Sequence, residues 1–195
     1  MNKRALYYSI TISLIIGIVL ILLVSIYFTS DKKVVYQNLE GGNVTLSYMD
    51  EFNGITISNA STTSDSKGMK LDGADQYFDF SIITKINEAS KIDYEISVVK
   101  DVNKSTTIDD YVRVYLEKLV DGSYSSVFGP VTYEPLTRKS SLGSKSGSMV
   151  LYKERRTMSG TDNYRLRVWL SDEAKIKKGS RQDITLLVYV NGKAS

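Results

Sequence analysis

Hydrophobic and polar residues alternate along much of the chain. Val44, Leu46 and Tyr48 are separated by Thr45 and Ser47. A period of two is typical of a strand that buries one face and exposes the other. The same pattern recurs in residues 55–58, 78–82, 92–98, 112–116, 164–170 and 184–190, and a further strand is expected around residues 149–153. We therefore predict seven to nine short strands.

The segments between these strands carry turn and loop signals. Asp121-Gly122 and Gly129-Pro130 predict turns, and the polar segments 58–76 and 137–148 predict exposed loops. Residues 171–178 are compatible with one helical turn or with a loop. Beyond residue 33 no segment keeps a period of 3.6 over ten residues. The pattern predicts an all-β domain, a two-sheet antiparallel sandwich of immunoglobulin-like type.

The first part of the chain follows a different pattern. Ala5 to Thr29 is an uncharged run of 25 residues that is rich in Leu, Ile and Val. At about 1.5 Å per residue such a helix crosses a hydrocarbon core of ~30 Å. Lys3 and Arg4 precede the run, whereas Asp31 offsets part of the charge that follows it. The positive-inside rule then predicts a cytoplasmic N-terminus.

We therefore expect two regions: residues 1–33, a single transmembrane signal-anchor in the plasma membrane, and residues 34–195, an extracytoplasmic β-sandwich. A cleaved signal peptide is one alternative, but its apolar core is shorter and ends in a small-x-small site, which Ser25-Ile26-Tyr27 fits poorly. The other alternative is a helix buried in the protein core, but so long an uncharged stretch is rare in such helices.

Charge narrows the class of partner. The net charge is +3, and residues 1–34 supply all of it with four basic residues against one acidic residue. The remaining 21 basic and 21 acidic side chains balance, which argues against a nucleic-acid partner. Residues 35–110 carry −7 and residues 111–195 carry +7. These halves either interleave in one fold or form complementary poles that favour self-association.

The chain contains no cysteine and no histidine. A disulfide framework and a thiolate metal site are thereby excluded. The commonest general base and the commonest zinc ligand are missing as well. A Ser-Lys pair remains possible as a nucleophile, and Ser30/Lys33 and Ser64/Lys67 have the bare spacing. This spacing arises by chance in a chain rich in Ser and Lys.

Two other groups of residues are candidates for binding. Asp65, Asp72 and Asp75 offer calcium-type oxygen ligands, but they lack the order of a calcium loop, and solvated turn residues explain them better. Aromatic and arginine side chains are expected on the outer face of the predicted strands, where they form either a surface for a protein or glycan partner or ordinary cross-strand packing pairs. They are Tyr111, Arg113, Tyr115, Arg165, Arg167 and Trp169. We assign no catalytic, cofactor-binding or metal-binding residue and predict no cofactor.

Several strand sequences carry a resemblance. They are Tyr77-Phe-Asp-Phe-Ser81, Asp110-Tyr-Val-Arg-Val-Tyr-Leu116 and Tyr164-Arg-Leu-Arg-Val-Trp-Leu-Ser-Asp-Glu173. In this order they resemble uncharacterised membrane-anchored extracytoplasmic proteins of low-GC Gram-positive bacteria. That group is loosely similar to the camelysin/TasA-type sandwiches of biofilm fibres, whose members have a cleavable signal. The resemblance implies a fold and supplies no functional residue.

The sequence thus predicts a non-enzymatic cell-surface module, structural, adhesive or assembly-related, tethered by one helix. The alternative is a subunit of an extracellular fibre, in which a strand such as Val34 to Leu39 completes a neighbour's sheet. A hydrolase that uses Ser-Lys or paired carboxylates is the third hypothesis, and it requires a deep polar pocket with perturbed carboxylates or lysines.

Overall fold

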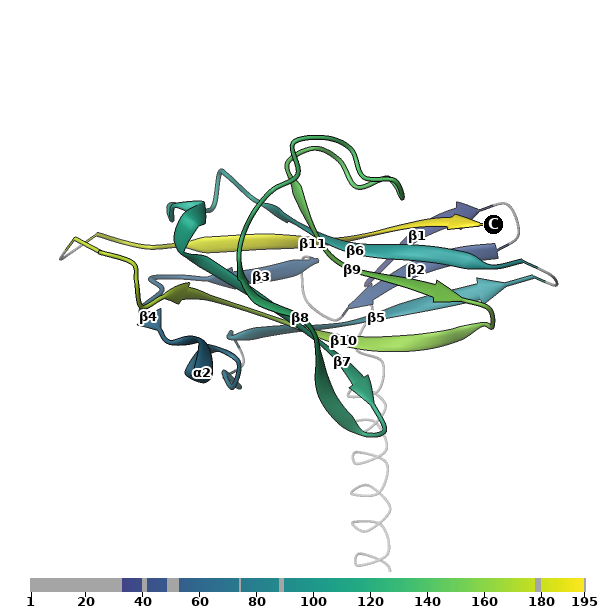
Figure 1. The fold of residues 1–195 in the computed structure, drawn as a ribbon, viewed down its shortest axis with the longest axis horizontal. Coiled ribbons are helices and arrows are strands. Elements are labelled where there is room, and N and C mark those ends of the chain that lie inside the picture. Colours follow the sequence, from purple (N-terminus) through teal and green to yellow (C-terminus); the bar gives the residue numbers. More distant parts are fainter. Residues whose placement is uncertain are drawn as a thin grey trace, which may run out of the picture. The chain divides into compact units, whose positions relative to one another are not determined.

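Two stacked β-sheets form the part of the chain that the computed structural model describes (Figure 1). The described residues are 33–39, 42–48, 53–73, 75–87, 90–177 and 180–194. The predicted membrane segment, residues 5–29, therefore lies outside them. In the described ranges, no helix has the length and apolar character needed to cross a membrane.

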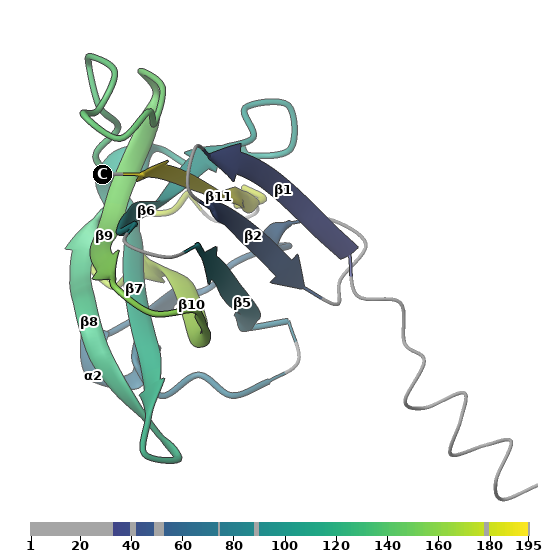
Figure 2. The ribbon, with the colours of Figure 1, turned by 90° about the vertical axis from the view of Figure 1, so that its right-hand side faces the viewer.

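The larger sheet has seven strands, and six of them follow the order β1-β2-β5-β10-β7-β8. Figure 2 shows β1 and β8 at its opposite edges. Its strands are β1 (Lys33–Leu39), β2 (Gly42–Tyr48), β4 (Thr62–Thr63), β5 (Tyr77–Ile86), β7 (Val112–Val120), β8 (Ser123–Thr132) and β10 (Gly160–Ser171). The pairs along this path are antiparallel, and the two-residue β4 adds a parallel bridge to the end of β10.

The smaller sheet has four antiparallel strands in the order β3-β11-β6-β9. They are β3 (Gly54–Ile57), β6 (Ile92–Lys100), β9 (Ser148–Arg156) and β11 (Ile184–Ala194). Within the described ranges, two short helices lie outside the sheets: the single turn α2 (Asp65–Gly68) and the 3-10 turn η1 (Asp109–Tyr111).

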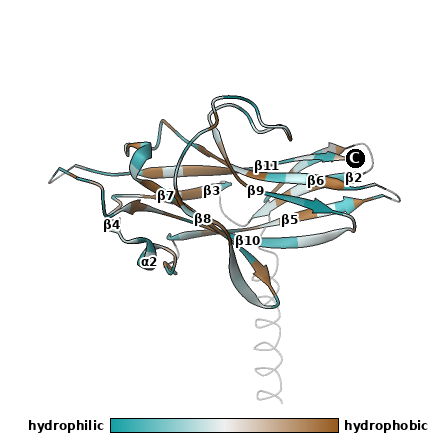
Figure 3. Ribbon diagram, viewed as in Figure 1, coloured by the Kyte–Doolittle hydropathy of each residue, from teal (hydrophilic) through white to brown (hydrophobic). Residues whose placement is uncertain are grey.

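The alternating pattern of the sequence creates the core between the sheets. In β5 the side chains of Phe78, Phe80 and Ile82 are buried, and Tyr164, Leu166 and Val168 of β10 are buried with them. Strands of the smaller sheet contribute Ile92, Tyr94, Ile96, Val98, Ile184, Leu186 and Val188. Hydrophobic positions concentrate in the strands of both layers, whereas α2 and the long connections are mostly hydrophilic (Figure 3). This confirms the predicted all-β, two-sheet sandwich.

Two local predictions were wrong. Gly129-Pro130 does not form a turn between strands: it lies inside β8, which is bulged where it pairs with β7. Segment 58–76 is also more than an exposed loop, because it contains β4 and α2 and buries Gly68. Tertiary contacts override the local signal in both places.

Candidate functional site

Strand β1 forms an apolar edge of the larger sheet. The exposed fractions of Val34, Val35 and Tyr36 are 40%, 47% and 70%. Among the described residues β1 pairs on one side, with β2. Its seven residues run in unbroken register from Lys33 opposite Tyr48 to Leu39 opposite Gly42. An edge of this kind presents unpaired backbone groups to another strand.

A side chain of β1 also holds the strand against the smaller sheet. The Gln37 amide donates to the backbone oxygen of Gly192 (3.2 Å) and accepts from its N–H (2.7 Å). A Cβ at Gly192 would lie 3.1 Å from Leu39 and 2.7 Å from Val44, so this position needs glycine for close approach. The edge strand is therefore fixed in place by both layers.

The other sheet edges carry features that discourage strand addition. β8 contains Pro130, which lacks an N–H, and its register against β7 shifts twice. β3 has four residues. β9 has a register shift against β6 and four consecutive charged residues, Lys153 to Arg156. The stretch of β11 beyond β3 is capped by Gln37 and by Asn53, whose amide donates to Val188 (2.6 Å). Among the described strands, β1 is the long edge without such protection.

The aromatic and arginine face predicted from the sequence is largely covered. Trp169 is 2% exposed and Tyr115 7%, and their rings meet edge to face at 6.4 Å. Helix α2 packs on the indole, whose Nε1 donates to Asp65 (3.2 Å). Arg167 is 7% exposed, forms an ion pair with Glu117 and donates to the backbone oxygen of Leu71 (2.6 Å). These groups are packing pairs rather than an open binding surface.

The remaining members of that set also have partners. Arg165 makes two 2.7 Å hydrogen bonds to Asp79 and stacks between Tyr77 and Tyr124, whose ring centroids are 3.9 and 4.3 Å from its guanidinium carbon. Arg113 donates to Glu173 at 3.3 Å. Tyr111 lies apart from them, in η1 against the core.

A polar network joins the two sheets at the side where β9 faces β7 and β10. Lys118 lies 2.8 Å from Glu154 and 3.1 Å from Asp162, and Arg156 lies 3.2 Å from the same Asp162 oxygen. The hydroxyl of Tyr94 donates to the other Asp162 oxygen at 2.9 Å. Two cations and two carboxylates balance, so this network, in which Asp162 is buried and Glu154 and Arg156 are half-buried, carries no net charge.

The pKa shifts in this network favour ionised lysine and neutral tyrosine. Burial alone would lower the pKa of Lys118, but hydrogen bonds to Glu154 and Asp162 outweigh burial and raise it. Burial raises the pKa of Tyr94 far above its ordinary value, and Tyr164 and Asp162 add to the effect. A lysine that acts as a general base needs the opposite shift.

The second polar loop, residues 137–148, is fastened to the outer face of the smaller sheet. Glu95 is fully buried beneath it and accepts hydrogen bonds from the Ser140 hydroxyl and from the Ser144 N–H (2.9 Å). Burial alone would raise the pKa of Glu95, but these hydrogen bonds and the nearby Lys153 lower it. Ser144 also bonds Ser97 (3.0 Å). The carboxylate thus organises the loop and stays ionised.

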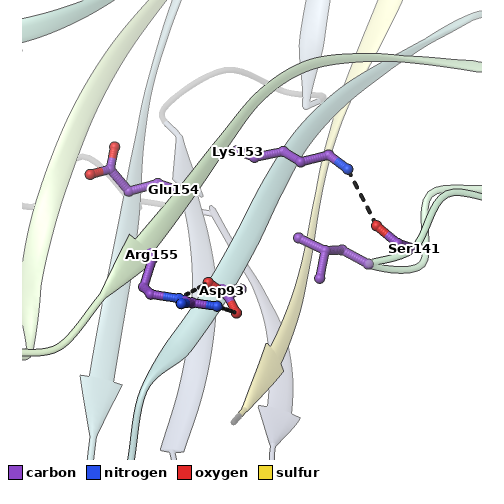
Figure 4. A pocket seen from close by; sticks show the side chains of 6 residues that line it. Asp93, Ser141, Lys153, Glu154 and Arg155 are labelled. Atoms are coloured by element: carbon purple, nitrogen blue, oxygen red, sulfur yellow. Dashed lines mark hydrogen bonds and ion pairs between the residues drawn. The ribbon is translucent and has the colours of Figure 1, made fainter.

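A shallow hollow of about 380 Å³ lies beside this loop (Figure 4). Arg155 makes a bidentate contact with Asp93 at 2.7 and 2.9 Å, and Lys153 donates to Ser141 at 3.3 Å. Sequence spacing gave no signal for this Ser-Lys contact, because the residues lie twelve positions apart. Lys153 also pairs with Glu95 at 3.5 Å, so its ammonium is bound by a carboxylate.

The Ser-Lys pairs that have the bare spacing in the sequence are not brought into a hydroxyl-to-amine contact by any described hydrogen bond. Ser64 lies before α2 and bonds the hydroxyl of Ser66 at 3.2 Å, and Ser30 lies outside the described residues. The three aspartates separate as well: Asp65 contacts Trp169, whereas Asp72 and Asp75 are exposed. Within the described ranges, no group of three metal-ligating side chains forms.

Comparisons with known proteins give no family. No protein-family model matches the chain, and no curated protein matches it. Solved structures that resemble it weakly include the following two. "Structure of infectious bursal disease virus Gt strain" has a TM-score of 0.30 at 7% identity and covers 84% of this chain, which spans 33% of the viral chain. "AvmM Catalyzes Macrocyclization in Alchivemycin A Biosynthesis" has a TM-score of 0.29 at 9% identity and covers 83% of this chain and 96% of that one. Structural similarities this weak give no information about the function of this chain.

Proposed function

We propose that this chain is a non-catalytic structural or adhesive module of the cell surface, tethered by residues 5–29, with strand β1 as its contact element. The observation that carries the proposal is the edge itself. β1 exposes Val34, Val35 and Tyr36 along a regular strand, while the other edges are short, bulged, charged or capped. Strand addition to such an edge gains affinity from backbone hydrogen bonds and specificity from alternate side chains.

The electrostatics of the polar clusters support a non-catalytic role over the hydrolase hypothesis. Lys118 and Lys153 each contact a carboxylate, and the pKa of Lys118 is raised. The pKa of Glu95 is lowered, which suits a structural anion better than a general acid. Described contacts account for each of these groups as part of a packing or loop-fastening pair.

The proposal includes three further predictions: the sandwich is of immunoglobulin type, the anchor is a transmembrane helix, and the chain is related to membrane-anchored Gram-positive proteins. The partner is expected to be a protein or glycan and not a nucleic acid, because residues 35–195 have no net charge. The fibre alternative is disfavoured by the edges, since an open polymer needs two complementary surfaces on each copy.

Two measurements test the proposal on the full chain. Membrane fractionation with protease accessibility is expected to find the chain at full length in the membrane fraction, with residues 34–195 cleavable from outside. A photoreactive phenylalanine analogue in place of Tyr36 is expected to form an adduct, whereas the same group at exposed Ser125 on β8 is not. A soluble chain, or equal labelling from both positions, would refute the proposal.

A further inference from the structure

We propose that β1 pairs with β1 of a second copy of this chain, so that two molecules form a closed antiparallel dimer about a two-fold axis. This inference rests on the proposed role of β1 as a contact element and names its partner. The pairing would join the two larger sheets edge to edge into one continuous sheet.

The number of open edges determines what kind of assembly is possible. In the described part of the molecule, β1 is the long regular edge without a bulge, a proline or a cluster of charges. A molecule with one open edge can use it once. Pairing like with like therefore saturates at two copies, whereas a filament requires a second, different edge. A single open edge thus predicts a closed dimer and not a series of larger oligomers.

The charges near this edge are compatible with a second copy. β1 and β2 together span fourteen residues, and Lys33 at the start of β1 is their one charged side chain. Antiparallel pairing places the start of one β1 opposite the end of the other. Lys33 then lies opposite Leu39 of the second copy, so the two lysines do not face each other. Apart from Lys33, β1 and β2 offer no charged side chain that an acidic or basic partner strand could pair with.

The register follows from the length of the strand. A two-fold axis at the middle residue pairs all seven residues, which places Tyr36 opposite Tyr36 and Val34 opposite Asn38. Other registers leave backbone groups at the ends unpaired. Val34 and Tyr36 lie on one face of the sheet and Val35 on the other, because side chains alternate along a strand. The second copy therefore covers exposed apolar side chains on both faces of the edge.

The chain offers a clean assay because it contains no cysteine. Tyr36→Cys in the full chain introduces a single thiol at the centre of the proposed pair, where directly opposite Cα atoms lie about 5 Å apart, within disulfide range. In membranes from expressing cells, mild oxidation is expected to give a disulfide dimer at least about tenfold above that of Ser125→Cys. Val34→Cys is the matched control on the same strand, because its two copies lie roughly 13 Å apart in this register.

Mixed samples test the register directly. Val34→Cys co-expressed with Asn38→Cys is expected to link, although neither links to itself. Tyr36→Lys is expected to abolish the dimer seen by size-exclusion chromatography with light scattering, and co-expression of Tyr36→Lys with Tyr36→Glu is expected to restore it. Tyr36→Phe, which keeps the aromatic ring, should dimerise as the wild type does. Tyr36 is 70% exposed, so these changes leave the core intact.

The disulfide assay and the photoreactive group at position 36 together separate two proposals: that β1 is the contact element, and that its partner is a second copy. A disulfide dimer and a photo-adduct of twice the chain mass support both. An adduct with a different protein, with Tyr36→Cys remaining monomeric, overturns the second-copy inference and leaves β1 as a contact element. A ladder of higher species overturns the closed dimer. No adduct and no disulfide overturn both.

Discussion

Asp162 is the residue whose replacement should most disturb the contact between the sheets. It is 7% exposed and accepts from Lys118 (3.1 Å), Arg156 (3.2 Å) and Tyr94 (2.9 Å). Asp162→Leu leaves two cations facing one carboxylate, Glu154, in a buried position. Removal of one partner of a buried ion pair costs about 3–5 kcal/mol, and we expect the low end, about 3 kcal/mol, because Lys118 keeps its bond to Glu154.

Urea unfolding of residues 33–195, which contain the whole described core, measures this loss. The fluorescence of the single tryptophan, Trp169, reports the transition. Asp93→Asn is the matched control, because its partner Arg155 is 62% exposed and such pairs contribute under about 1 kcal/mol. Lys118→Met combined with Asp162→Leu should recover part of the loss, since one of the two cations left facing Glu154 is gone. Equal effects of Asp162→Leu and Asp93→Asn would refute the reasoning.

Three further predictions concern other parts of the sandwich. The pKa of Glu95 is lowered from 4.5, so its contribution to stability is present above pH 4.5 and is lost as the pH falls through the folded value. In urea titrations between pH 3 and 6, the free energy of unfolding should therefore fall less with acid in Glu95→Gln than in the wild type. The pKa of Tyr94 is raised from 10.0, so its contribution is complete below pH 10 and declines above it, and Tyr94→Phe should flatten that alkaline decline in thermal melts. Gly68→Ala places a Cβ 2.3 Å from the Trp169 ring and should cost about 1–3 kcal/mol with a red-shifted emission, whereas an unchanged emission would contradict the described packing.

The strands with clean alternation were predictable from the sequence. Residues 164–170 and 184–190 became β10 and β11, and the hydrophobic residue at every second position of each is buried. They are Tyr164, Leu166, Val168 and Leu170 in β10, and Ile184, Leu186 and Val188 in β11. β8 was missed, since its serines and the Gly129-Pro130 step resemble a connection, although Asp121-Gly122 is the turn of the hairpin that pairs β8 with β7.

The same limit applies to the candidate site. The outer aromatic face was predicted, but its burial was not, because the cover comes from α2, about a hundred residues before Trp169. The contact of Glu95 with Ser140 likewise joins residues 45 positions apart. The fibre hypothesis already gave Val34 to Leu39 a role in strand addition. The structure adds that the other sheet edges are protected against it. Edge protection is a property of the assembled sheets and cannot be read from one strand.

Hydrogen–deuterium exchange of the β1 backbone amides in the full chain tests the central claim most directly. In an unpaired edge strand alternate amides face solvent and exchange quickly, whereas pairing on both sides protects them. We expect the protection of β1 to rise with protein concentration and to disappear in Tyr36→Lys, while the protection of β10 stays constant. Fast exchange of β1 at every concentration, equal in the wild type and Tyr36→Lys, would contradict it.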